Sequence, residues 1–136
     1  MLLGTETRDI DHKNRIAIPK KFLKELCSHE LVFRLKQEKG IPFMEIYEKE
    51  QREQKYQEKI FASIFQELSN IPNGELPIHS EGRITLTKEI LHHLFGSEYR
   101  NIHQKQLIFW GAKSHIKLFT TKDETSVGKY VQNFRK

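Results

Sequence analysis

The chain has 136 residues, a formal net charge of +5 and 37% hydrophobic residues, a size and composition that suit one domain with a single core. No run approaches the roughly 18 apolar residues that a membrane-spanning helix needs, and Arg8 and Asp9 interrupt the apolar start too early for a secretory signal. The single cysteine, Cys27, excludes an intrachain disulfide and favours a reducing cytoplasm.

The first predicted elements surround a short polar turn. The phrase Ile10–Pro19 reads as a strand, a tight turn and a second strand that ends at the proline. Apolar residues at helical spacing then predict a short amphipathic helix at Phe22–Leu26. Two further strands are predicted, at Leu31–Leu35 and at the alternating segment Phe43–Tyr47.

A helical connector is predicted next, over residues 49–76. Its apolar residues fall on one stripe of an amphipathic helix, formed by Tyr56, Ile60, Phe61, Ile64, Phe65 and Leu68. The dipeptide Asn73-Gly74, between Pro72 and Pro77, ends this helix. From residue 45 to residue 67 six acids face four bases, so this region is acidic.

The remaining elements repeat the first half in the same order. Ile78–Thr87 again reads as strand, turn and strand, 68 residues after the first copy. A helix is predicted at Ile90–Leu94, and strands are predicted at Leu107–Trp110 and His115–Phe119. We therefore predict a fold built from two copies of one unit. Most aromatic residues fall in these apolar segments, so Phe33, Phe109 and Trp110 are expected in the core.

The first turn presents a lysine and an arginine. Asp11 can accept hydrogen bonds from backbone amides two residues on, and Asn14 occupies a position that calls for a positive φ. A turn of this kind projects Lys13 and Arg15 away from the core. The guanidinium of Arg15 suits a phosphate or a guanine edge, and Lys13 suits phosphate. Alternatively, Arg15 pairs with Asp11 or Asp9 and holds the turn shut.

The second turn departs from the first in ways that weaken its charge. His79 stands in place of the aspartate, and Glu81 places a negative charge beside Arg83. Gly82 fills the position of positive φ, and Thr87 is expected to cap the following helix. We expect a preserved turn that contributes less to binding than the first.

Basic residues cluster around the first turn. Residues 8–24 hold six bases, among them Arg8, Lys20 and Lys21, against two acids. A basic face beside a near-neutral body favours phosphate binding, because released counterions supply much of the affinity. The alternative is that these side chains are simply solvated.

The doubled turn, each copy followed by a short helix and two strands, resembles the MraZ family of bacterial transcription regulators, which have two AbrB/SpoVT-type repeats. The resemblance covers most of residues 1–120. It implies a mainly β fold with short helices (α+β), in which two swapped-hairpin units at 1–48 and 77–124 form a double-split β-barrel. It also implies a homo-oligomeric ring that binds double-stranded DNA at the promoter of the division and cell-wall genes. The connector is shorter than is usual in the family, and a basic tail at 125–136 follows the second unit.

The sequence thus predicts a nucleoid-associated DNA-binding regulator that contacts DNA through Lys13, Arg15, Arg8, Lys20, Lys21 and Arg83. A second hypothesis is an oligomeric scaffold that acts through protein partners and has only non-specific DNA affinity. No enzyme signature, cofactor motif or metal-ligand cluster is recognised, so neither catalysis nor a cofactor is expected.

Overall fold

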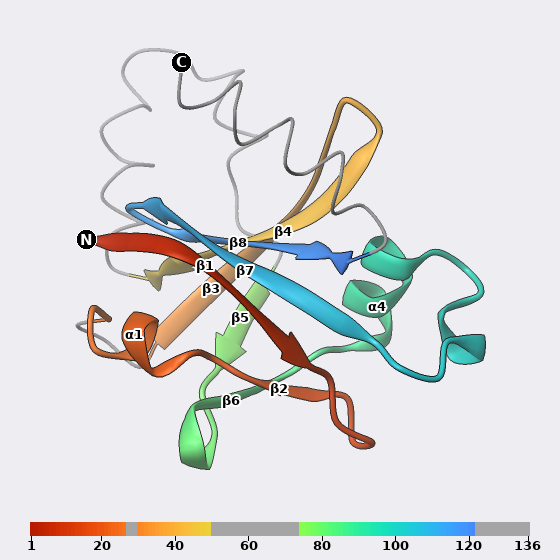
Figure 1. Ribbon diagram of the computed structural model, residues 1–136, viewed down its shortest axis with the longest axis horizontal. Coiled ribbons are helices and arrows are strands. Elements are labelled where there is room, and N and C mark those ends of the chain that lie inside the picture. The colour runs from red at the N-terminus through yellow and green to blue at the C-terminus, as the bar shows by residue number, and fades with distance from the viewer. Residues whose placement is uncertain (27–29, 50–73, 122–136) are drawn as a thin grey trace.

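The computed structural model describes residues 1–26, 30–49 and 74–121 (Figure 1). Cys27, the predicted connector stripe and the tail at 125–136 lie outside these residues. The described part is mainly β with a few short helices, as the sequence predicted. Its strands are β1 (Leu2–Asp9), β2 (Arg15–Ala17), β3 (Glu30–Glu38), β4 (Ile41–Glu48), β5 (Gly74–Pro77), β6 (Arg83–Thr85), β7 (Gln106–Lys113) and β8 (Ile116–Thr120).

Six strands form one antiparallel sheet in the order β1-β7-β8-β4-β3-β5, and β2 pairs with β6 separately. β1 and β5 are the two edges of the large sheet. The described strands therefore form an open sheet and not a closed barrel. β5 begins at Gly74, within the segment that we assigned to the connector.

Strands of the two halves of the chain pair with each other at three places in the large sheet and again in the β2–β6 pair. β1 pairs with β7, β5 pairs with β3, and β4 pairs with β8 at the centre. The strands β1 to β4 of the first half correspond in order to β5 to β8 of the second half. If each strand is exchanged for its counterpart, the same pairs result and the sheet has the same order read from its other edge. Neither half can complete its sheet alone.

The helices are short and lie on one side of the sheet, with β2 and β6 (Figure 1). α1 (Lys20–Leu23) begins after Pro19 and buries Phe22, whose ring centroid lies 6.4 Å from that of Phe109. It is shorter than the helix expected at residues 22–26. α4 (Lys88–Phe95) is capped by Thr87, whose hydroxyl accepts a hydrogen bond from the amide of Ile90 at 3.4 Å, which confirms the predicted cap.

The main core lies between the sheet and this layer. It joins residues of β2, β6 and both helices to one face of the sheet, and it contains Phe33 and Phe109. Trp110 is also buried, as expected, but it packs on the opposite face with Ile41, Phe43 and Phe119. The core fixes β2 and β6 against the sheet, and these two strands carry the turns.

Candidate nucleic-acid interface

Asp11 organises the first turn through its own side chain. Its Oδ1 accepts hydrogen bonds from the backbone amides of Lys13 at 2.8 Å and Arg15 at 2.9 Å. The amide of Asn14 donates to the Asp11 carbonyl at 3.0 Å, and Asn14 adopts a φ of 60°. The predicted Asx-type turn and the positive φ are both confirmed.

Arg15 also forms an ion pair within the turn. Its Nε lies 3.3 Å from Asp11 Oδ2, and both side chains are partly exposed. Of the two acids considered for this pairing, the structure selects Asp11, because Asp9 accepts a hydrogen bond from Gln106 at 2.7 Å. Burial acts to raise the pKa of Asp11, but the amides of Arg15 and Lys13 and the Arg15 charge together lower it below its usual value. The carboxylate therefore stays charged in the turn.

The second turn repeats the backbone hydrogen bonds of the first. The amide of His79 donates to the Arg83 carbonyl at 2.7 Å, as Asp11 does to Arg15 at 2.8 Å. Gly82 takes a φ of 71°, in agreement with its predicted role. Glu81 also adopts a left-handed conformation, with a φ of 63°, and its carboxylate lies 3.1 Å from Arg83 Nη2. Sequence reasoning did not predict this second positive φ, because glutamate carries no signal for it.

The two turns are joined through the β2–β6 ribbon. Ile16 pairs with Ile84, and both side chains point into the core. Arg15 and Arg83 lie on the outer face, because Arg15 pairs with Thr85 and Arg83 pairs with Ala17. Such diagonal neighbours have their Cα atoms roughly 7–8 Å apart.

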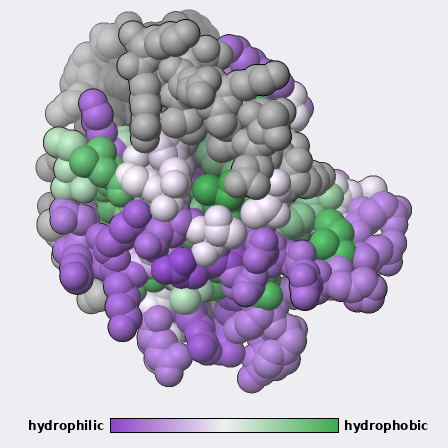
Figure 2. Space-filling view, viewed as in Figure 1, coloured by the Kyte–Doolittle hydropathy of each residue, from purple (hydrophilic) through white to green (hydrophobic). Residues whose placement is uncertain are grey.

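Each turn also accepts a hydrogen bond from a residue just past the strand that follows the other turn. The carbonyl of Asn14 accepts from Leu86 at 2.8 Å, and that of Gly82 accepts from Ile18 at 2.9 Å. The turns extend from opposite ends of the ribbon (Figure 1), and the surface over this part of the molecule is mostly hydrophilic (Figure 2). The ribbon thus holds two arginines in a fixed relation on one exposed face.

Three other predicted residues meet in a groove beside the ribbon. The groove has a volume of about 580 Å³, and its lining includes Arg8, Lys20 and Lys21 together with the acids Glu6 and Glu81. Arg8 Nη2 lies 2.8 Å from Glu6 Oε2, and Lys21 Nζ lies 3.4 Å from the carbonyl oxygen of Thr5. Lys13 and Arg15 are not among the residues that line this groove.

Among the predicted contact residues, the lysines Lys13, Lys20 and Lys21 are exposed, and none of them forms an ion pair with another residue in the described ranges. In contrast, Arg8, Arg15 and Arg83 each pair with an acid close to them in the chain. The candidate interface therefore consists of three exposed lysines and three arginines whose guanidinium groups are already positioned.

Within the described residues, no group of three or more His, Cys, Asp or Glu side chains is placed to hold a metal ion. No helix in the same ranges is long and apolar enough to span a bilayer.

The fold and the site define a class, a mainly β protein that presents paired arginine turns on an exposed ribbon. A family model described as "MraZ protein, putative antitoxin-like" matches residues 1–73, which is more than half of the chain. The chain belongs to the MraZ family, as the doubled turn predicted, and the match indicates an MraZ-like regulator. No curated protein matches the chain.

Proposed function

We propose that this protein is a transcriptional regulator that binds double-stranded DNA through the outer face of the β2–β6 ribbon. The observation that carries this proposal is the placement of Arg15 and Arg83 on that face, with Ile16 and Ile84 buried beneath them. A two-stranded ribbon fits the major groove of B-form DNA, where an arginine can bind the O6 and N7 atoms of guanine.

The basic residues have different roles in this proposal. Arg15 reads base edges from the first turn, and Lys13 and Lys20 contact phosphates and fix the register. Arg8 and Lys21 add positive charge along the neighbouring groove. Arg83 contributes less, because its partner Glu81, at 3.1 Å, stands where the first turn has the additional base Lys13. The first turn is the stronger of the two contacts.

We also propose that residues 1–48 and 77–124 are two copies of one swapped-hairpin unit in a double-split arrangement, joined by a connector at 49–76. The exchange symmetry of the strand order and the matching hydrogen bonds of the two turns support this interpretation. The copies would give each subunit one strong and one weak turn.

The native assembly in this proposal is a homo-oligomeric ring in the cytoplasm, associated with the nucleoid. A ring would place several first turns on tandem sites in the promoter of the division and cell-wall genes. Linked weak contacts gain roughly 10²–10⁴ in affinity where their spacing allows simultaneous binding. Such avidity would compensate for arginines that pair with acids in the free protein.

The test is fluorescence anisotropy with the DNA upstream of the protein's own gene, measured at two salt concentrations beside a shuffled duplex. Arg15→Ala should weaken binding to the native duplex by about 1–3 kcal/mol per engaged turn. Arg100→Ala is the matched control, because Arg100 is an exposed arginine that lies over the ring of Tyr99, away from the ribbon. Equal loss in both variants would show that only net charge matters and would contradict the role of Arg15.

A second candidate function is an oligomeric scaffold with only non-specific DNA affinity. It is favoured by the ion pairs of Arg8, Arg15 and Arg83, since a paired arginine must break or share a contact before it binds a base. Equal binding to both duplexes, lost together as salt rises, would support this candidate over the specific regulator.

A further inference from the structure

β1 is an eight-residue strand at the edge of the large sheet, paired on one side with β7. Ile10, just beyond its end, donates its amide to the carbonyl of Lys105 at 2.9 Å and continues the pairing with that side. Because hydrogen-bonding groups alternate along an antiparallel strand, the even-numbered residues face β7 and the odd-numbered residues face the open edge. Thr5 and Thr7 therefore direct their amides and carbonyls outward.

Two basic side chains cover the outward carbonyls. Lys21 Nζ lies 3.4 Å from the Thr5 oxygen, and Arg8 Nη1 lies 2.9 Å from the Thr7 oxygen. Gly4 makes room for the lysine, because a Cβ at this position would lie 2.7 Å from Lys21 Nζ. These residues, which the sequence suggested for DNA contact, are thus engaged with the edge of the sheet.

The large hydrophobic side chains that are exposed in the described part of the chain are Leu3, on this strand at 55%, and Met1, just before it at 73%. An open strand edge beside exposed apolar groups is a template for pairing with another strand. A second β1 fits this template, because an antiparallel pair centred on Thr5 would join outward groups of both copies and place each Leu3 opposite a Thr7.

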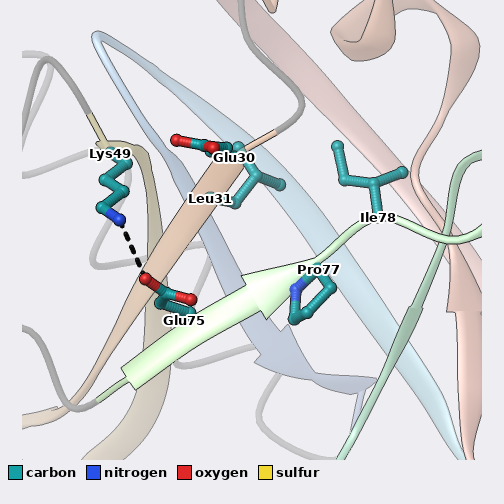
Figure 3. Close-up of a pocket in the computed structure, with 6 residues that line it drawn as sticks. All are labelled: Glu30, Leu31, Lys49, Glu75, Pro77 and Ile78. Carbon is teal, nitrogen blue, oxygen red and sulfur yellow. Dashed lines mark hydrogen bonds and ion pairs between the residues drawn. The ribbon is translucent and has the colours of Figure 1, made fainter.

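The opposite edge of the sheet is protected in another way. β5 has only four residues and ends at Pro77, which has no amide hydrogen to donate. Lys49 Nζ lies 2.9 Å from Glu75 Oε1 beside a recess of about 190 Å³ (Figure 3). β1 is longer and contains no proline. Its edge is protected by the side chains of Lys21 and Arg8 instead.

We propose that the open edge of β1 is a latent strand-addition surface for the β1 of a second copy, and that Lys21 and Arg8 keep it closed. Pairing would displace both side chains from their carbonyls and bring the Lys21 ammonium groups of the two copies together across the new contact, whereas Glu6 already offsets the charge of Arg8. The repulsion between the ammonium groups and the lost hydrogen bonds oppose the pairing. Strand addition becomes favourable when the two cations are removed.

The experiment compares sedimentation velocity of the full chain over a range of concentrations, without DNA. The variant Arg8→Ala/Lys21→Ala should lower the dissociation constant for association beyond the wild-type assembly, whatever the size of that assembly, at least tenfold. The control Lys20→Ala/Lys24→Ala removes the same charge from exposed positions on or next to α1 and should match the wild type. Equal behaviour of the two double variants would overturn the proposal.

Hydrogen exchange locates the contact even if the variants fold less stably. The amides of Thr5 and Thr7 should exchange freely in the wild type and at least tenfold more slowly in the associated Arg8→Ala/Lys21→Ala variant. Adding Thr5→Pro to that variant should restore the sedimentation of the wild type, because proline removes an outward donor without breaking the pairing with β7. Association with unchanged exchange at Thr5 and Thr7 would also overturn the proposal.

Discussion

Asn14 and Gly82 occupy the same place in the two turns, and both adopt a left-handed backbone conformation. The turns use different residues because their surroundings differ. Asn14 is exposed, and its backbone is fixed by the Asp11 carbonyl. Gly82 lies against α1, where a Cβ would be 2.5 Å from Leu23 Cδ1. Asparagine therefore suffices at the first turn, whereas the second needs glycine for both its φ and its space.

Replacing Gly82 by alanine should destabilise the protein more than the same change at another glycine with positive φ. We expect Gly82→Ala to lower the free energy of unfolding by about 2–4 kcal/mol, the sum of backbone strain and overpacking. Gly40→Ala is the control, because Gly40 has a φ of 80° and a Cβ there would meet nothing within 4 Å. It should cost about 1–2 kcal/mol in urea denaturation. Equal losses of unfolding free energy in the two variants would mean that the Leu23 side chain moves away from the new Cβ without any loss of stability.

At the scale of elements, the sequence predicted local features better than long-range ones. The Asp11 turn and the Thr87 cap depend on neighbouring residues, so their chemistry is visible in the chain. The pairing of β1 with β7 depends on residues about 100 positions apart, and no local pattern specifies it. The left-handed Glu81 and the engagement of Lys21 with Thr5 depend on tertiary contacts in the same way. The DNA-binding roles of these residues stay predictions.

Glu45 is an acid that is buried on a strand, where it interacts with several basic side chains. It belongs both to the strand predicted at Phe43–Tyr47 and to the acidic region 45–67, and on β4 it is only 4% exposed. Its oxygens lie 3.4 Å from His115 Nε2, 3.9 Å from Lys36 Nζ and 4.0 Å from Arg34 Nη1. Lys117 pairs with it in the neighbouring strand. The acid thus sits among bases from β3 and β8.

Replacing Glu45 by glutamine should remove this central charge and destabilise the sheet by about 3 kcal/mol near neutral pH. Burial acts to raise the pKa of Glu45, but contact with His115 and the charges of Lys36, His115 and Arg34 outweigh it, so the pKa lies below the usual value for glutamate. Its stabilising effect is therefore present above the usual pKa of glutamate and is lost as pH falls through the lowered value. Chemical denaturation from pH 3 to pH 7 should show a smaller acid-induced loss in the variant.

The exposed acid Glu75 provides the control for this measurement. Its side chain is 68% exposed and pairs with Lys49, so Glu75→Gln should change stability by less than about 1 kcal/mol. The steep acid loss of the wild type should remain in this control. An unchanged acid loss in Glu45→Gln would contradict the assignment of that loss to Glu45.

For the whole molecule, the near-symmetric fold carries an asymmetric charge. The exchange of halves preserves the strand order and the turn hydrogen bonds, but Lys13 in the first turn corresponds to Glu81 in the second. Glu81 also lines the groove with Arg8, Lys20 and Lys21. The single carboxylate of Glu81 therefore makes the electrostatic potential less positive at both the second turn and the groove. On this account the second turn is weak because of Glu81 rather than because of its backbone.

Changing Glu81 to lysine should make the second turn resemble the first in charge without altering its backbone hydrogen bonds. It frees Arg83 and adds a base, so one further phosphate contact is expected. That contact would steepen the dependence of log K on log salt by about 0.9 and strengthen DNA binding roughly fivefold to tenfold at 0.1 M salt. Glu98→Lys makes the same change of charge beyond the end of α4 and should have a smaller effect, because Glu98 is exposed and bonded to Asn101, outside both turns and the ribbon. Titrations by anisotropy at four salt concentrations measure both slopes, and equal slopes in the two variants would show that the position of Glu81 is unimportant.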